Sequence, residues 1–162
     1  MHDKIPFLAQ ELAEVLRQRS LKVTCAESCT GGGVASAITD VAGSSAWFEY
    51  GFVTYSNDAK QQLLNLSERT LLDEGAVSAE IVEQMALGAL KVSRADVAVA
   101  ISGIAGPEGG SEDKPVGTVW FCWVLATGKK ELSCELFAGD RAAVRAAAVE
   151  KSLSGLLDIL KK

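Results

Sequence analysis

Two short apolar runs in this sequence each lead directly into a glycine-rich loop, and this arrangement restricts the fold more than any other feature. The run at residues 21–26 precedes the segment ESCTGGG, and the run DVAVAI at residues 96–101 precedes SGIAGPEGG. A short apolar run bounded by turn residues is typical of a buried β-strand. Both loops are therefore expected at the carboxyl ends of strands, where open α/β sheets bind their ligands.

Helical and strand-like patterns alternate along the chain. Helices are predicted at residues 5–19, 31–41, 57–64, 67–75 and 78–90 and from residue 140 to the C-terminus, with Asn57, Ser67 and Asp140 as N-caps and Ser78 just before its helix. Strands are predicted at residues 21–26, 47–55, 96–101, 116–126 and 131–137, with a hairpin turn at TGKK. Parallel crossovers mixed with one hairpin predict an α/β fold, a three-layer α/β/α sandwich with a mixed, mostly parallel sheet.

Length and charge limit the partners that this chain can have. Its 162 residues, 48% of them hydrophobic, suit a single domain with one sizeable core. No apolar run reaches the roughly 20 residues of a membrane helix, and the charged N-terminal segment is unlike a signal peptide. The net charge of −5 lacks the broad basic field of nucleic-acid-binding proteins. We expect a cytoplasmic protein with no membrane or nucleic-acid partner.

A single histidine, His2, stands near the start of the chain, and this scarcity argues against several kinds of active site. A Ser-His-Asp triad, a Cys-His dyad or a histidine-based metal site would have to recruit it. The four cysteines form no CxxC pair and match no zinc-site spacing. Cys25, Cys122 and Cys134 are most simply explained as buried, reduced thiols. We expect neither a metal nor a cofactor.

The segment TCAESCTGGG, residues 24–33, is the first candidate site. A strand enters it and a helix leaves it, so the first helical amides lack internal partners and carry partial positive charge. Its glycines let a ligand approach the backbone, and such a turn is typical of an anion seat, most naturally for a phosphate. A tight strand-to-helix turn capped by Thr30 explains the same residues, and both interpretations stay open.

Ser28 and Cys29 add possible nucleophiles to this turn. A hydroxyl could attack a carbonyl while turn amides stabilise the oxyanion, whereas a cysteine normally needs a basic or cationic neighbour. Without a usable histidine, a serine activated by a lysine is the economical choice. With Asn57 as N-cap, Lys60 falls at the third helical position, where the helix dipole and partial burial both favour the neutral amine of a general base.

Four other polar residues could complete the site. Tyr55 ends the strand before Lys60 and could hydrogen-bond into it, and Ser102 in the second loop is a candidate ligand contact. Arg141 begins the last helix and Arg145 follows one turn later, so their guanidinium groups could bind a phosphate. The alternatives are an exposed helix lysine at position 60, a turn hydroxyl at Ser102 and two solvated arginines.

Together, the motifs AESCTGG, GSSAWFEYGFVTYSNDAK, GAVS, SGIAGPEGGSEDKPVGTVW and GDR resemble the CinA C-terminal domain family in its stand-alone form. The resemblance runs from the first helix to the last, and implies a single CinA C-terminal-like amidohydrolase domain over residues 1–162. It also implies an activity similar to that of nicotinamide-nucleotide amidohydrolases. These enzymes hydrolyse the carboxamide of nicotinamide mononucleotide (NMN) to nicotinic acid mononucleotide and ammonia, in pyridine nucleotide recycling.

The resemblance further implies a metal-free serine-lysine mechanism. The family's serine falls on Ser28, its lysine on Lys60 and its tyrosine on Tyr55. The substrate-binding positions that it implies are Thr30, Gly31, Gly32, Ser102 and Arg141. Some relatives carry threonine at the position of Ser102, which keeps the hydroxyl.

The resemblance also bears on partners and on alternatives. It implies a small pyridine nucleotide as substrate and self-association, with a homodimer favoured. Larger relatives fuse this domain to one linked to pyrophosphate hydrolysis, an activity that we do not expect here. The alternative function is a non-catalytic phosphorylated-nucleotide-binding or regulatory module, because glycine-rich loops beyond strand ends also suit binding alone.

Overall fold

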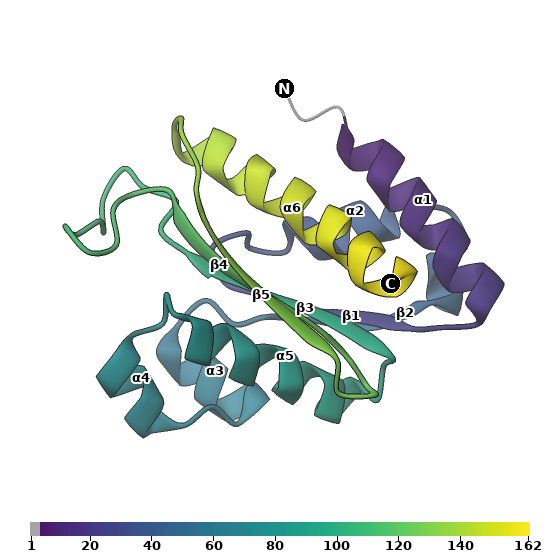
Figure 1. The fold of residues 1–162 in the computed structure, drawn as a ribbon, viewed down its shortest axis with the longest axis horizontal. Helices are drawn as coiled ribbons and strands as arrows, with labels where there is room; N and C mark the ends of the chain where they lie inside the picture. Colours follow the sequence, from purple (N-terminus) through teal and green to yellow (C-terminus); the bar gives the residue numbers. More distant parts are fainter. Residues whose placement is uncertain (1–3) are drawn as a thin grey trace.

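The computed structural model describes residues 4–162 and places one β-sheet between two layers of helices (Figure 1). The strands are β1 (Val23–Glu27), β2 (Phe48–Val53), β3 (Val97–Gly103), β4 (Thr118–Leu125) and β5 (Lys130–Leu136). The helices are α1 (Lys4–Arg19), α2 (Gly33–Thr39), α3 (Asn57–Leu64), α4 (Glu68–Glu74), α5 (Ala79–Ser93) and α6 (Arg141–Lys161), with a short 3-10 helix η1 (Ser44–Ala46). The order of helices and strands is the predicted one, apart from η1.

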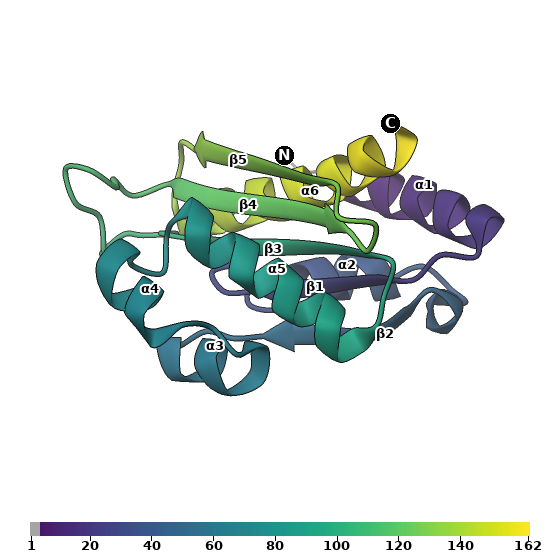
Figure 2. The same cartoon turned by 60° about the horizontal axis from the view of Figure 1, so that its bottom comes forward.

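The sheet has the strand order β2-β1-β3-β4-β5. Strand β1 pairs in parallel with β2 and β3, whereas β4 pairs antiparallel with β3 and β5. Only β4 therefore runs against the other strands, and Figure 2 shows its arrow opposed to that of β5. The predicted three-layer sandwich with a mixed, mostly parallel sheet is confirmed.

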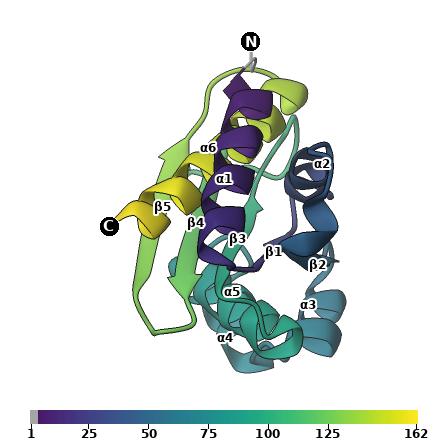
Figure 3. The same cartoon turned by 90° about the vertical axis from the view of Figure 1, so that its right-hand side faces the viewer.

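The two faces of the sheet bury two separate hydrophobic clusters. Helices α1, α2 and α6 cover one face, and α3, α4 and α5 cover the other (Figures 1 and 3). In the central strand β3, Val97, Val99 and Ile101 belong to the first cluster, and Ala98 and Ala100 belong to the second. A central strand that is buried on both faces needs such a continuous apolar run, which explains the sequence DVAVAI.

Helix α5 approaches α3 closely at Gly88. A Cβ atom at this position would lie 2.4 Å from the backbone oxygen of Leu64, so only glycine fits here. Helix α5 in turn packs on β1, β3 and β4. This packing holds α3, the helix that carries Lys60, in a fixed position beside the sheet.

The N-cap of α3 is Ser56, and the prediction of Asn57 was wrong. Ser56 has an extended backbone, with φ −96° and ψ 163°, and its Oγ accepts a hydrogen bond from the amide of Ala59 at 3.0 Å. Asn57 is the first helical residue, so Lys60 lies at the fourth helical position, one further than predicted. The predicted N-caps Ser67 and Asp140 are confirmed, and Ser78, predicted to lie just before its helix, is the N-cap of α5.

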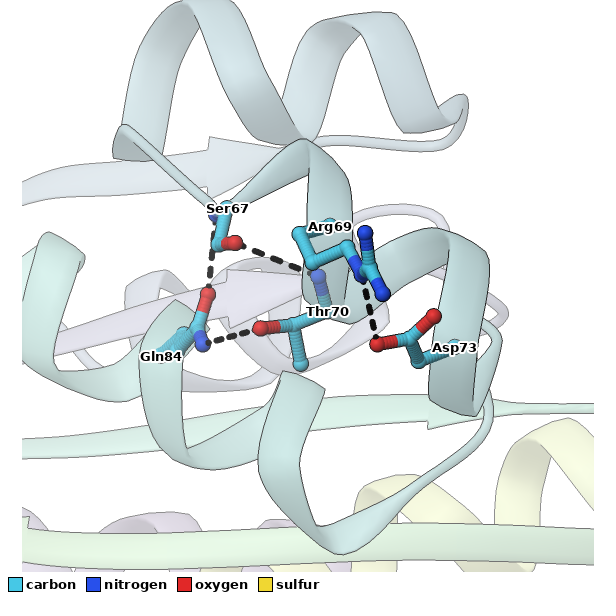
Figure 4. A network of polar contacts seen from close by, with 5 residues as sticks. All are labelled: Ser67, Arg69, Thr70, Asp73 and Gln84. Carbon is cyan, nitrogen blue, oxygen red and sulfur yellow. Dashed lines mark hydrogen bonds and ion pairs between the residues drawn. The ribbon is translucent and has the colours of Figure 1, made fainter.

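A polar network fastens the start of α4 to α5 (Figure 4). The Oγ of Ser67 accepts from the amide of Thr70 at 3.1 Å, and the amide of Ser67 donates to the side chain of Gln84 at 3.0 Å. Gln84 also donates to the hydroxyl of Thr70 at 3.2 Å. Arg69 and Asp73 form an ion pair at 2.9 Å on the same helix. The cap of α4 is therefore tied to α5.

The cysteines are as predicted except at one position. Cys25, Cys29 and Cys122 are buried, but Cys134 is exposed, because β5 is an edge strand whose side chains alternate between exposed and half-buried. His2 lies outside the described residues. None of the helices between residues 4 and 162 combines the length and apolar character needed to cross a membrane.

Candidate active site

The register of the sheet brings the two glycine-rich loops together. Strands β1 and β3 are parallel neighbours, with Glu27 opposite Ile101. The amide of Ser28 donates to the carbonyl of Ile101 at 3.0 Å, which extends the pairing one residue beyond β1. Ser28 therefore lies beside Ser102, and both are buried. The expectation that the two loops share one edge of the sheet is confirmed.

Ser28 and Lys60 contact each other although 32 positions separate them in the chain. The Nζ atom of Lys60 lies 3.0 Å from Ser28 Oγ, 2.8 Å from the carbonyl oxygen of Thr54 and 3.4 Å from that of Tyr55. The amide of Thr54 also donates to the carbonyl of Glu27 at 2.8 Å, so the end of β2 lies beside the serine turn. The structure thus brings the predicted serine and lysine together.

Burial changes the protonation of this lysine. Lys60 is 1% exposed, the largest fully buried side chain of the described residues. Desolvation by this burial lowers the pKa of Lys60 from 10.5 to about 8, and the opposing influence of Cys29 is smaller. A substantial fraction of the amine is then neutral near pH 8, and its lone pair can accept the Ser28 proton.

Cys29 lies in the same turn but has the wrong protonation state for a nucleophile. Burial raises the pKa of Cys29 to about 11. A thiol of this kind stays protonated near neutral pH, and only the thiolate is reactive. Of the two nucleophiles considered for the turn, the geometry and the pKa values both favour Ser28.

The N-terminus of α2 is filled by the chain itself, so the expected phosphate seat at this position was wrong. The buried carboxylate of Glu27 accepts from the amides of Gly32, Val34 and Ala35 at 3.2, 2.9 and 3.0 Å. The first amides of a helix have no acceptor within the helix, and here the Glu27 side chain supplies one. Sequence reasoning missed Glu27, although an acidic residue that ends an apolar strand just before such amides was a usable signal.

The glycines of the turn are required by its backbone. Gly31 has φ +58° and Gly32 has φ +102°, values that residues with a Cβ rarely adopt, so α2 starts at Gly33, two residues later than predicted. The N-cap is Gly32, and the predicted Thr30 cap was wrong. The Thr30 hydroxyl is buried and has no hydrogen-bond partner among the described residues.

Arg145 holds the carbonyl side of this turn. Its Nε donates to the carbonyl of Cys29 at 3.1 Å, and its Nη2 donates to the carbonyl of Thr30 at 3.2 Å. The side chain is half-buried, and two of its nitrogens are used by the turn itself. Sequence reasoning considered a phosphate contact or a solvated side chain for Arg145 and did not anticipate its hydrogen bonds to the turn.

Arg141 and Tyr55 contact each other at the entrance to the second loop. Arg141 donates to the Tyr55 hydroxyl at 2.9 Å and to the carbonyl of Gly106 at 2.8 Å. Tyr55 lies two residues beyond the end of β2, and its side chain is 58% exposed. Its carbonyl oxygen accepts from Lys60, but its phenol contacts Arg141 instead of the dyad. Arg141 thus links α6, the second loop and the segment after β2.

The backbone amides after Ser28 are a further feature of the site. Within residues 4–162 the amide of Thr30 has no hydrogen-bond acceptor, and the amide of Cys29 contacts only the thiol of its own side chain. In that same range no three histidine, cysteine, aspartate or glutamate side chains are grouped so that they could hold a metal ion. The site thus combines a nucleophile, Ser28, a base, Lys60, and a backbone N–H donor at Thr30. Acyl transfer needs these three kinds of group.

Comparison with known proteins identifies clear relatives. The CinA C-terminal domain model matches residues 6–160. Nicotinamide-nucleotide amidohydrolase PncC of Escherichia coli K12 is 58% identical over 92% of this chain and 90% of its own, and that of Pseudomonas putida is 53% identical over 97% and 98%. The crystal structure of the competence/damage inducible protein CihA from Agrobacterium tumefaciens superposes with a TM-score of 0.95 at 43% identity, over 98% of this chain and 96% of that one.

Proposed function

The chain belongs to the CinA C-terminal domain family, and from this premise we propose that it hydrolyses the carboxamide of NMN to nicotinic acid mononucleotide and ammonia. Relatives that carry the name nicotinamide-nucleotide amidohydrolase match it over nearly their full lengths. The single observation that carries a serine-lysine mechanism is the 3.0 Å contact between Lys60 Nζ and Ser28 Oγ in a buried site.

The first half of the proposed reaction forms an acyl-enzyme. Ser28 Oγ attacks the carboxamide carbon while neutral Lys60 takes the hydroxyl proton. The carbonyl oxygen becomes negatively charged, and in this proposal the backbone amides after Ser28, above all that of Thr30, stabilise it. When the intermediate collapses, the C–N bond breaks, and protonated Lys60 returns its proton to the departing nitrogen, which leaves as ammonia.

The second half uses water in place of the serine hydroxyl. Lys60, neutral again, takes a proton from a water molecule that attacks the acyl carbon. The bond to Ser28 Oγ then breaks, and Lys60 returns the proton to this oxygen. The products are free serine and a carboxylic acid, which releases its proton to solvent and becomes a carboxylate, and no redox step or metal is involved.

The nucleotide phosphate supplies binding energy away from the reacting carbon. In this proposal Arg141 recognises it, since its guanidinium lies at the exposed Tyr55 phenol, whereas the amides of α2 are taken by Glu27. Thr30, Gly31, Gly32 and Ser102 surround the acyl end. Gly32 contributes through its missing side chain, because its amide already donates to Glu27.

The proposal extends to the assembly and its surroundings. We propose that the protein works in the cytoplasm as a homo-oligomer, with a dimer favoured. The exposed Tyr50 and Val53 on the edge strand β2 support self-association. Light scattering should then give a multiple of the 17.0 kDa chain mass, and a monomer mass would contradict it.

The test is ammonia release from NMN by three variants. Ser28→Ala and Lys60→Met, which keeps the lysine's volume, should each lower kcat by about a thousandfold or more. Cys29→Ala is the matched control, and it should keep most of the activity because its thiol stays protonated. Thermal melts verify folding of all three.

Two outcomes would count against the proposal. Near-normal turnover in a folded Ser28→Ala or Lys60→Met variant would contradict the dyad. Tight binding of NMN by the wild type in calorimetry, with no ammonia released, would favour the non-catalytic binding module.

A further inference from the structure

Two charged side chains that take no part in the proposed reaction hold the serine turn from opposite sides. Glu27 binds its amides and Arg145 binds its carbonyls. Glu27 ends β1 and Arg145 lies in the second turn of α6, so the turn is fixed between the sheet and a helix. This arrangement goes beyond the roles that the mechanism assigns to Ser28 and Lys60.

The Glu27 carboxylate is fully buried and uses both of its oxygens. Oε1 accepts from the amides of Gly32 and Val34, and Oε2 accepts from the amide of Ala35 and, at 3.6 Å, from the thiol of Cys25. Hydrogen bonds to an ionised carboxylate are about twice as strong as neutral ones, and the N-terminus of a helix favours negative charge. The end of the turn that enters α2 is therefore immobilised.

Arg145 fixes the peptide plane that follows Cys29. In a planar trans peptide the C=O and N–H groups point in opposite directions. Because the Cys29 carbonyl accepts from Arg145, the Thr30 N–H of the same peptide must point away from the guanidinium. Among the described residues this N–H has no hydrogen-bond acceptor.

We infer that Glu27 and Arg145 are positioning residues, which together orient the Cys29–Thr30 peptide so that the Thr30 N–H faces the substrate oxygen. The inference rests on the proposed amidase function. Arg145 acts through the backbone and touches no part of the nucleotide, in contrast to Arg141, which is proposed to bind its phosphate. The guanidinium of Arg145 packs closely against the turn, since a Cβ at Gly31 would lie 3.1 Å from Arg145 Nη2.

The experiment compares NMN with nicotinamide riboside, the same amide without its phosphate. In Arg145→Lys, kcat should fall by about tenfold to a hundredfold for both substrates, because one lysine cannot hold two carbonyls, while KM changes by less than about twofold. In the matched variant Arg141→Lys, KM should rise for NMN and stay nearly unchanged for the riboside. Glu27→Gln should resemble Arg145→Lys, because its amide nitrogen cannot accept from the turn.

A merely structural role is separated by melting curves and by rescue. Arg145→Ala assayed with added methylguanidinium should recover part of its kcat if the guanidinium acts on the turn, and Arg145→Lys should melt within a few degrees of the wild type. If Glu27→Gln does not fold, the Arg145 variants alone test the inference. An Arg145→Lys variant with unchanged kcat, or with a KM increase restricted to NMN, would overturn the inference. A wild type that releases ammonia from neither substrate would overturn the proposed function as well.

Discussion

At the scale of single residues, the protonation state of Lys60 is the property that depends most on its surroundings. A lysine in solution is charged near neutral pH, whereas this one is buried and hydrogen-bonded to Ser28 and to two carbonyl oxygens. Desolvation lowers its pKa to about 8. The same burial that makes the lysine costly for folding makes it a usable base.

The first prediction concerns the pH dependence of activity. Because only neutral Lys60 can act as a base, kcat/KM should rise with pH to a plateau above about 8 and fall as the pH drops below that value. Assays with NMN and nicotinamide riboside should show the same fall in kcat/KM at low pH. Because the riboside has no phosphate, this result would exclude titration of the substrate phosphate, whose pKa is about 6, as the cause. A flat profile from pH 6 to about 9, or a limb near the ordinary lysine pKa of 10.5, would contradict the assignment.

The second prediction concerns stability. The pKa of Lys60 is lower in the folded chain than in the unfolded chain, so the unfolded chain binds more protons between pH 8 and 10.5. The free energy of unfolding should therefore gain a contribution as the pH rises through this window. Lys60→Met should lack the gain, and denaturant unfolding of both proteins measures the difference. Parallel pH dependences would show that Lys60 is not perturbed.

The sequence was sufficient to predict the nucleophile and the base, Ser28 and Lys60, because few residue types can fill these roles. The near absence of histidine left a serine and a lysine as the remaining pair, and they lie within hydrogen-bond distance. It failed for Glu27 and Arg145, because their roles depend on which backbone groups of the turn face inward. For Glu27 its place at the end of a strand was a signal that was overlooked, whereas the hydrogen bonds of Arg145 follow from the tertiary packing of α6 against the turn.

At the scale of elements, α3 decides where the base lies. Ser56 caps it, Gly88 lets α5 approach it, and the amide of Thr54 ties the preceding segment to β1. The sequence predicted every α-helix and strand in the right order, since their apolar periods are clear, but not the short η1. It misplaced this cap by one residue, because Ser56 and Asn57 are both good capping residues and only the backbone conformation separates them.

The third prediction compares two capping serines. Ser56→Ala and Ser67→Ala each remove a side-chain acceptor for the third residue beyond, so each should lower the stability by about 1 kcal/mol. Only Ser56→Ala loosens the first turn that carries Lys60, so only this variant should lower kcat, by about two- to tenfold. Melting curves and ammonia assays measure both effects. Equal kcat in the two variants would show that the α3 cap does not position the base.

At the scale of the whole molecule, the site lies at the carboxyl ends of β1, β2 and β3. The parallel strands β1, β2 and β3 bring their following loops to one edge of the sheet, while β4, which runs the opposite way, and β5 extend the sheet beyond β3. The sequence predicted this layout from strand-to-loop order alone. It could not predict that Arg141 would link the second loop to Tyr55, since α6 begins far away in the chain.

The fourth prediction is that the protein is indifferent to chelators. The proposed mechanism moves protons between Ser28, Lys60, water and ammonia and involves no Lewis acid. Dialysis against EDTA should leave kcat and the melting temperature unchanged. A large loss of ammonia release that a divalent ion restores would contradict the mechanism.

The most direct test of the serine-lysine mechanism is to trap the acyl-enzyme. Rapid quenching with NMN, followed by intact-mass measurement, should show a covalent adduct equal to the substrate minus ammonia. Trypsin yields a peptide from Val23 to Lys60 that contains both Ser28 and Cys29, so fragmentation must place the adduct. The adduct should be on Ser28 and should be missing from Ser28→Ala. An adduct on Cys29, or a burst of ammonia with no covalent species, would contradict it.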